Sequence, residues 1–96
     1  MTRDEIYGLI VQILSDTFEV DSADITPEAN IFEDLGLDSI DAIDIFVQLR
    51  DVTQRRPIPD EARVIRTVSE LVVYVEKELA ARDAGLPEPR PTTRAD

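Results

Sequence analysis

The sequence contains no cysteine and no histidine. Without cysteine, the chain can form neither a disulfide framework nor a thiolate metal site. Without histidine, it lacks the commonest metal ligand, the usual general base and any Ser-His or Cys-His pair. We therefore expect no metal site in the chain and no catalysis by its own side chains.

Long hydrophobic runs are also missing. No apolar stretch approaches the roughly 20 residues that a membrane-spanning helix needs. The first residues, Met1 to Glu5, lack the basic start and the apolar run of a signal peptide. Aromatic residues make up only 5% of the chain and tryptophan is absent, so the core must be aliphatic. These absences predict a cytoplasmic protein that does not enter membranes.

Acidic residues dominate the charge. Ten Lys and Arg residues stand against 21 Asp and Glu residues, which gives a net charge of −11. Such a surface repels the phosphate backbone of nucleic acids and anionic membranes. The hydrophobic fraction of 43% is nevertheless too high for a wholly disordered acidic chain. The 96 residues have room for one domain, so we expect a small monomer that works through protein partners.

The first predicted helix covers residues 3–18. Thr2 and Glu5 have the spacing of a capping box, in which each side chain accepts the other's backbone N–H. Apolar residues then recur with the period of a helix and form one stripe: Ile6, Leu9, Ile10, Ile13 and Leu14.

A long connection follows, over residues 19–38, and it is rich in turn formers. A loop of this length inside a small domain is usually functional or held by its own side chains. We expect a short helical turn starting near Thr26. We also expect its apolar residues to plug one end of the bundle: Val20, Ile25, Ile31, Phe32, Leu35 and Leu37.

The next predicted helix begins at Asp38-Ser39 and runs to about Thr53, with apolar residues on two faces. One stripe, which we expect to face inward, consists of Ala42, Ile45, Phe46 and Leu49. The other consists of Ile40, Ile43 and Val47, and it is either additional core or an apolar surface patch.

Two further helices complete the expected fold. Asp60 can cap a short helix over residues 61–65, and Thr67 with Glu70 forms a capping box for a helix that ends near Arg82. The last stripe consists of Val68, Leu71, Val72, Val75 and Leu79. We predict an all-α four-helix bundle with three main helices, one short helix and a long first loop, over residues 1–82. The proline-rich residues 83–96 are expected to be a disordered tail.

The stretch from Asp34 to Ile40 is the most informative for function. Gly36 permits a turn that other residues would strain. If Asp38 caps the helix, Ser39 occupies the first helical position with its hydroxyl free, where the helix dipole favours an attached anion. A serine at a helix start is more often simply a cap, so the position alone leaves both interpretations open.

This stretch and its setting resemble the acyl carrier protein family. The resemblance covers residues 3–82 and depends on Leu35-Gly36-Leu37-Asp38-Ser39-Ile40, followed by Ile58-Pro59-Asp60 before a final helix. It implies that Ser39 carries 4'-phosphopantetheine, which a phosphopantetheinyl transferase attaches from coenzyme A with magnesium. The thiol of that arm would hold acyl groups as thioesters, and the chain would be a carrier, not an enzyme.

The resemblance also suggests a docking surface. One helix face carries three acidic residues, Asp38, Asp41 and Asp44. Their carboxylates are either simply solvated or serve as docking charges for basic patches on partner proteins. The expected partners are the transferase and acyl-transferring, ketosynthase and reductase-type enzymes. The residues expected to face them are Ile40, Asp41, Ile43, Asp44 and Val47.

The pathway is expected to depart from housekeeping fatty-acid synthesis. Housekeeping carriers are often acidic and aromatic after the second helix, whereas here Arg50, Arg55 and Arg56 interrupt the acidic surface. The run from Asp38 to Asp44, with Val47 to Arg50, is more similar to dedicated carriers of aryl-polyene or polyketide-like pathways. Two alternatives remain open at this point. One is a peptidyl or aryl carrier of an amino-acid-activating assembly line, and the other is an unmodified acidic helical module that binds a basic partner.

Overall fold

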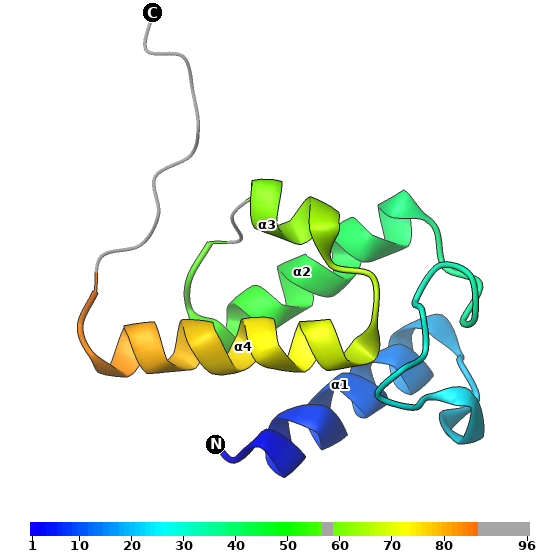
Figure 1. The fold of residues 1–96 in the computed structure, drawn as a ribbon, viewed down its shortest axis with the longest axis horizontal. Helices are drawn as coiled ribbons and strands as arrows, with labels where there is room; N and C mark the ends of the chain where they lie inside the picture. The colour runs from blue at the N-terminus through cyan, green and yellow to red at the C-terminus, as the bar shows by residue number, and fades with distance from the viewer. Residues whose placement is uncertain (57–58, 87–96) are drawn as a thin grey trace, which may run out of the picture.

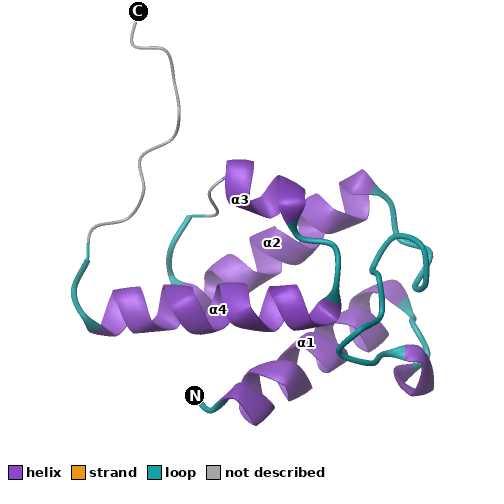
Figure 2. Cartoon of the chain, viewed as in Figure 1, coloured by secondary structure: helices purple, strands orange, loops and turns teal. Residues whose placement is uncertain are grey.

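A computed structural model describes residues 1–56 and 59–86, and it contains four α-helices in this part of the chain (Figure 1). The elements are α1 (Arg3–Phe18), the 3₁₀ helix η1 (Ser22–Asp24), α2 (Ser39–Thr53), α3 (Pro59–Val64) and α4 (Val68–Asp83). No strand occurs among these residues, apart from an isolated bridge between Asn30 and Thr67 (Figure 2). The all-α four-helix fold is confirmed.

Local sequence signals set the helix starts. Complete capping boxes open α1 and α4, formed by Thr2 with Glu5 and by Thr67 with Glu70. The chain leaves α1 and α2 through left-handed residues, Glu19 and Gln54, with φ of 58° and 57°. The bounds predicted for α1, α2 and α4 agree with the structure to within one residue. The short helix begins earlier than predicted, at Pro59. Proline is well tolerated in the first turn of a helix, because residues there donate no intrahelical hydrogen bond and the N–H that proline lacks is not needed.

The core is aliphatic, as the composition predicts. α4 packs against both α1 and α2. Phe46 and Tyr74 add one edge-to-face aromatic contact, with ring centroids 5.2 Å apart. The buried apolar residues are Ile6, Ile10, Leu14, Ile25, Ala29, Ile31, Ile45, Phe46, Leu49, Ile65, Val68, Leu71, Val72, Tyr74, Val75 and Leu79.

The long loop lies at one end of the bundle, where α1 ends and where α2 and α4 begin (Figure 1). Ile25 and Ile31 are buried there, and the other predicted plug residues pack against the core. The expected turn at Thr26 is present, with the Ala29 N–H donating to the Thr26 carbonyl at 3.0 Å, but it is not helical. The short helix of the loop is η1, four residues earlier. The Asp21 side chain stabilises η1 by accepting the Ala23 N–H.

Backbone hydrogen bonds join the long loop to the connection between α3 and α4. The Ile31 N–H donates to the Arg66 carbonyl at 2.8 Å, and the Val68 N–H donates to the Ala29 carbonyl at 3.1 Å. The Tyr7 hydroxyl donates to the Ile25 carbonyl and ties the same loop to α1. The loop is therefore fixed on both sides, and its last residues lead directly into α2.

Arg55 is not on the surface, contrary to the sequence-based prediction. Its Nε donates to Glu78 Oε1 at 2.9 Å, and both side chains are less than a tenth exposed. Its Nη1 donates to the Leu86 carbonyl at 2.8 Å, so the chain after α4 contacts the bundle at that residue. The remainder of the predicted tail, 87–96, lies outside the described residues.

Within the described part, no helix is long and apolar enough to cross a membrane.

Candidate functional site

Ser39 is the first residue of α2, and its hydroxyl is not used to cap the helix. The Asp41 N–H donates to Asp38 Oδ1 at 2.9 Å, and the Asp38 N–H donates to Asp41 Oδ2 at 3.2 Å. This reciprocal box satisfies the helix start without the serine. Ser39 is exposed, and its hydroxyl forms no hydrogen bond with any residue that the structure describes. The interpretation of Ser39 as a simple cap is therefore wrong.

Gly36 provides the turn that brings the loop into α2. Its φ is +73°, in the left-handed region where residues with a Cβ are strained. The Leu37 N–H then donates back to the Ile31 carbonyl at 3.1 Å. A Cβ on Gly36 would meet no atom within 4 Å, so the glycine serves the backbone conformation and not a close approach.

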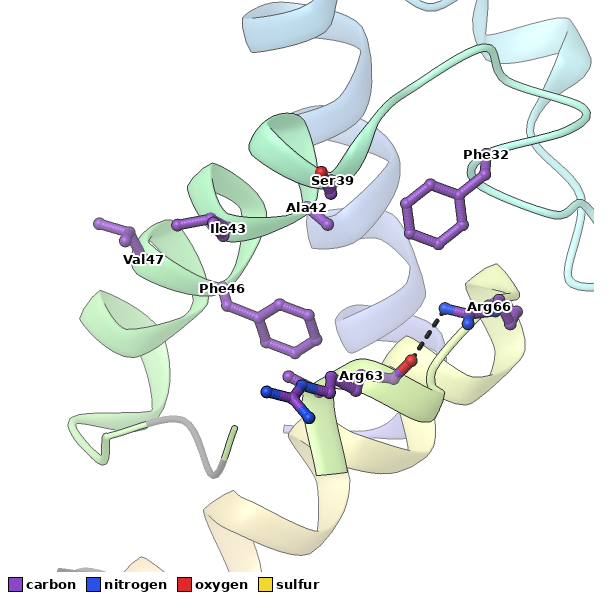
Figure 3. Close-up of a pocket in the computed structure, with 9 residues that line it drawn as sticks. Phe32, Ser39, Ala42, Ile43, Phe46, Val47, Arg63 and Arg66 are labelled. Carbon is purple, nitrogen blue, oxygen red and sulfur yellow. Dashed lines mark hydrogen bonds between the residues drawn. The ribbon is translucent and has the colours of Figure 1, made fainter. Parts of the chain in front are cut away.

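A cleft of about 590 Å³ opens beside Ser39, between α2 and α3 (Figure 3). One wall is the face of α2 that carries Ser39, and the opposite wall is formed by α3 and the residues after it. Phe32 of the long loop closes one side of the cleft. The lining residues are Phe32, Ser39, Ala42, Ile43, Phe46, Val47, Ala62, Arg63 and Arg66. The space next to the serine is therefore mainly apolar, with cationic side chains on the α3 side.

Arg63 and Arg66 were not recognised as site residues from the sequence. The Arg66 guanidinium lies 5.3 Å from the centroid of the Phe32 ring, a cation–π distance. Its Nη1 also donates to the Arg63 carbonyl at 2.8 Å (Figure 3). The sequence shows two arginines three positions apart in a chain with a net charge of −11. No local pattern indicated which side of the bundle these arginines face.

The expected docking residues fall into two groups. Ile40, Ile43 and Val47 are 73%, 65% and 55% exposed, so the second stripe of α2 is an apolar surface patch. Asp44 is exposed beside them. Asp41 is only half-buried, and its carboxylate already belongs to the capping box. Across residues 1–56 and 59–86, no cluster of three or more acidic side chains is arranged to hold a metal ion.

Comparison with known families and proteins agrees with this site. Residues 8–75 match the phosphopantetheine attachment site family. The chain is 44% identical over 81 residues to acyl carrier protein 2 of Ralstonia nicotianae, covering 84% of this chain and 100% of that protein. It is 38% identical over 76 residues to the acyl carrier protein of Lactobacillus acidophilus, covering 79% and 95%. The acyl carrier protein of Thermotoga maritima has a similar fold, with a TM-score of 0.75, 32% identity and coverage of 84% and 94%.

The region of similarity includes Ser39, the long loop and all the residues that line the cleft. Members of this family carry a covalently attached 4'-phosphopantetheine arm and are carriers, not enzymes. An exposed serine hydroxyl with no partner among the described residues, next to an open apolar cleft, fits such an arm. On the family match and the two relatives together, the chain belongs to the acyl carrier protein family.

Proposed function

We propose that Ser39 is the residue to which the arm is attached. The observation that carries this proposal is the Asp38–Asp41 box, which leaves the serine hydroxyl exposed and chemically available. Attachment forms the bond from Ser39 Oγ to phosphorus, breaks the phosphoanhydride of coenzyme A, releases its nucleotide part and removes the hydroxyl proton. The thiol of the bound arm supplies the chemistry, because it holds acyl groups as thioesters.

The residues around Ser39 then have distinct tasks. Gly36 and Asp38 set the direction in which the chain enters α2 and present the hydroxyl outward. The apolar wall of the cleft, which includes Ala42 and Phe46, provides a place where an acyl chain avoids water. The chain needs no catalytic side chain for this task, consistent with its lack of histidine and cysteine.

Partner enzymes are proposed to dock on the exposed face of α2. Ile40, Ile43 and Val47 provide an apolar anchor, and Asp44 provides charge beside them. A basic patch on the transferase, or on a ketosynthase- or reductase-type enzyme, would be steered toward this face.

The cargo is proposed to be an acyl intermediate of fatty-acid or polyketide-like biosynthesis. The expectation of a dedicated pathway depended in part on three arginines, one in the last turn of α2 and two just after it, and one of these, Arg55, is buried. Arg50 and Arg56 remain exposed there and are the features that separate this surface from a uniformly acidic one. Loading assays that compare an acyl ligase with an amino-acid-adenylating enzyme distinguish this cargo from that of a peptidyl or aryl carrier.

Intact-mass measurement tests the attachment residue. Incubation with a broad-specificity transferase, coenzyme A and magnesium should add one phosphopantetheine to the wild type and none to Ser39→Ala. Ser69→Ala is the matched control, because Ser69 is also an exposed serine at a helix start, and it should be modified like the wild type. A mass gain in a folded Ser39→Ala variant would contradict the proposal.

A further inference from the structure

The cleft contains two cationic side chains that the carrier role alone does not require. The chain has a net charge of −11, yet both charged residues that line the cleft, Arg63 and Arg66, are basic. We propose that these two arginines bind the phosphodiester that modification places on Ser39. The first part of the arm then lies across the cleft, toward α3, and does not point away into solvent. This inference rests on the proposed attachment at Ser39.

The charges around Ser39 favour a cation near the phosphodiester. A phosphodiester on Ser39 brings a negative charge next to Asp38 and Asp41, whose carboxylates are held at the start of α2 by their capping bonds. Like charges at such short range repel each other. Arginine is well suited to offset this repulsion, because its planar guanidinium can donate two parallel hydrogen bonds to phosphate oxygens.

Arg66 is fixed against the loop that leads into Ser39. Arg66 is held in place through its backbone, since its carbonyl accepts the Ile31 N–H, and its guanidinium lies against Phe32. The same loop continues through Gly36 into Ser39, so the serine and the arginine are coupled by a short, fixed segment. Figure 3 shows Ser39 on the α2 side of the cleft and Arg66 on the opposite side, below Phe32. The Arg63 guanidinium lies further along the cleft, below the Phe46 ring, and its exposed side chain has to swing toward Ser39 to reach the phosphodiester.

The Arg66 guanidinium retains N–H donors that can bind a ligand. The Arg66 guanidinium uses one N–H for the Arg63 carbonyl, which leaves others for a ligand. Neither arginine forms a side-chain ion pair with a described residue. Glu70 follows Arg66 by four residues, but its Oε1 accepts the backbone N–H groups of Arg66 and Thr67.

The competing explanation is that Arg66 only stabilises the end of α3. That role predicts the same loss of stability in the unmodified and the modified protein when Arg66 is replaced. A phosphodiester contact instead predicts an effect that exists only after modification. The test therefore compares the apo and holo forms of each variant, with intact mass first establishing that modification is complete.

The variants are Arg63→Gln, Arg66→Gln and the double variant, with Arg50→Gln as the control. Arg50 is an exposed arginine on α2 that does not line the cleft. We expect the side-chain Nε–Hε signals of Arg63 and Arg66 to shift in ¹⁵N NMR spectra when the wild type is converted to the holo form. The Nε–Hε signal of Arg50 should keep its position. We also expect modification to lower the melting temperature of the double variant by about 4 °C relative to its effect on the wild type and on Arg50→Gln.

The outcomes separate the two proposals. If no mass is added to the wild type, the attachment at Ser39 fails. If mass is added but the Nε–Hε signals of both arginines are unchanged, and the apo-to-holo shift in melting temperature is equal in all variants, the arginine proposal fails alone. Equal destabilisation of the apo and holo forms by Arg66→Gln would likewise assign that residue to α3 only and overturn the proposal for it.

Discussion

At the residue scale, Arg55 and Glu78 form an ion pair in which both side chains are buried. It joins the turn after α2 to α4, and Arg55 also reaches the Leu86 carbonyl beyond α4. The chain exits α2 through Gln54, and the Thr53 hydroxyl accepts the Arg55 N–H at 3.2 Å, which turns the arginine inward. A buried charge that loses its partner is far more costly than the same charge in water.

Glu78→Leu should therefore destabilise the protein by about 3–5 kcal/mol, because it removes the Glu78 carboxylate from the buried Arg55 guanidinium. The double variant Arg55→Met with Glu78→Leu should recover most of that loss, since it removes both charges. Urea unfolding followed by circular dichroism measures both. A single variant as stable as the double variant would show that the Glu78 carboxylate is not needed to offset the buried Arg55 charge.

At the element scale, the start of α2 combines a structural role with a proposed docking role. Asp41 closes the capping box, whereas Asp44 has no hydrogen bond or ion pair with any described residue. Asp41→Ala should lower the free energy of unfolding by about 1 kcal/mol, as loss of a cap does. Asp44→Ala should change it by less than about 0.5 kcal/mol. Denaturant titration checks both, and an equal effect of the two variants would contradict the assignment.

The start of α4 has a pH-dependent cap. Hydrogen bonds from the Arg66 and Thr67 N–H groups hold the pKa of Glu70 below its ordinary value, with a smaller contribution from the Arg66 charge. Because the pKa is lowered on folding, the carboxylate stabilises the fold above the unfolded-state pKa, and this stability disappears as the pH falls through the folded-state pKa.

Glu70→Gln should therefore be less stable than the wild type at pH 7. The difference should shrink as the pH drops below about 4.5. Melting curves of the two proteins over a pH series give the measurement. A stability difference that stays constant down to strongly acidic pH would show that ionisation of Glu70 does not contribute to the cap.

Capping explains which parts of this fold the sequence could predict. The boxes at Thr2 and Thr67 are local patterns, so the starts of α1 and α4 followed from neighbouring residues. The sequence left open whether Asp38 or Ser39 caps α2, and the Asp38–Asp41 box of the structure decides that question. The burial of Arg55 and the position of Arg66 on the cleft depend on how distant segments pack. No local pattern encodes either of them.

At the scale of the whole molecule, the net charge of −11 should govern how partners approach. Long-range attraction raises encounter rates and is screened by salt. The transferase reaction should be slower for Asp44→Lys than for the wild type at low salt, and the two rates should converge as salt increases. Steady-state rates at several salt concentrations measure this effect. Equal rates at low salt would remove Asp44 from the docking surface.

Attachment of the arm to the Ser39 hydroxyl is the proposal on which the carrier function of this chain depends. Its most direct test is fragmentation mass spectrometry of the wild-type protein after complete modification, which assigns the added group to a single residue. We predict that the fragment ions place it on Ser39 and leave the other serines, including Ser15 and Ser22, unchanged. A group found on any other hydroxyl, or a folded protein that a competent transferase leaves unmodified, would contradict the account.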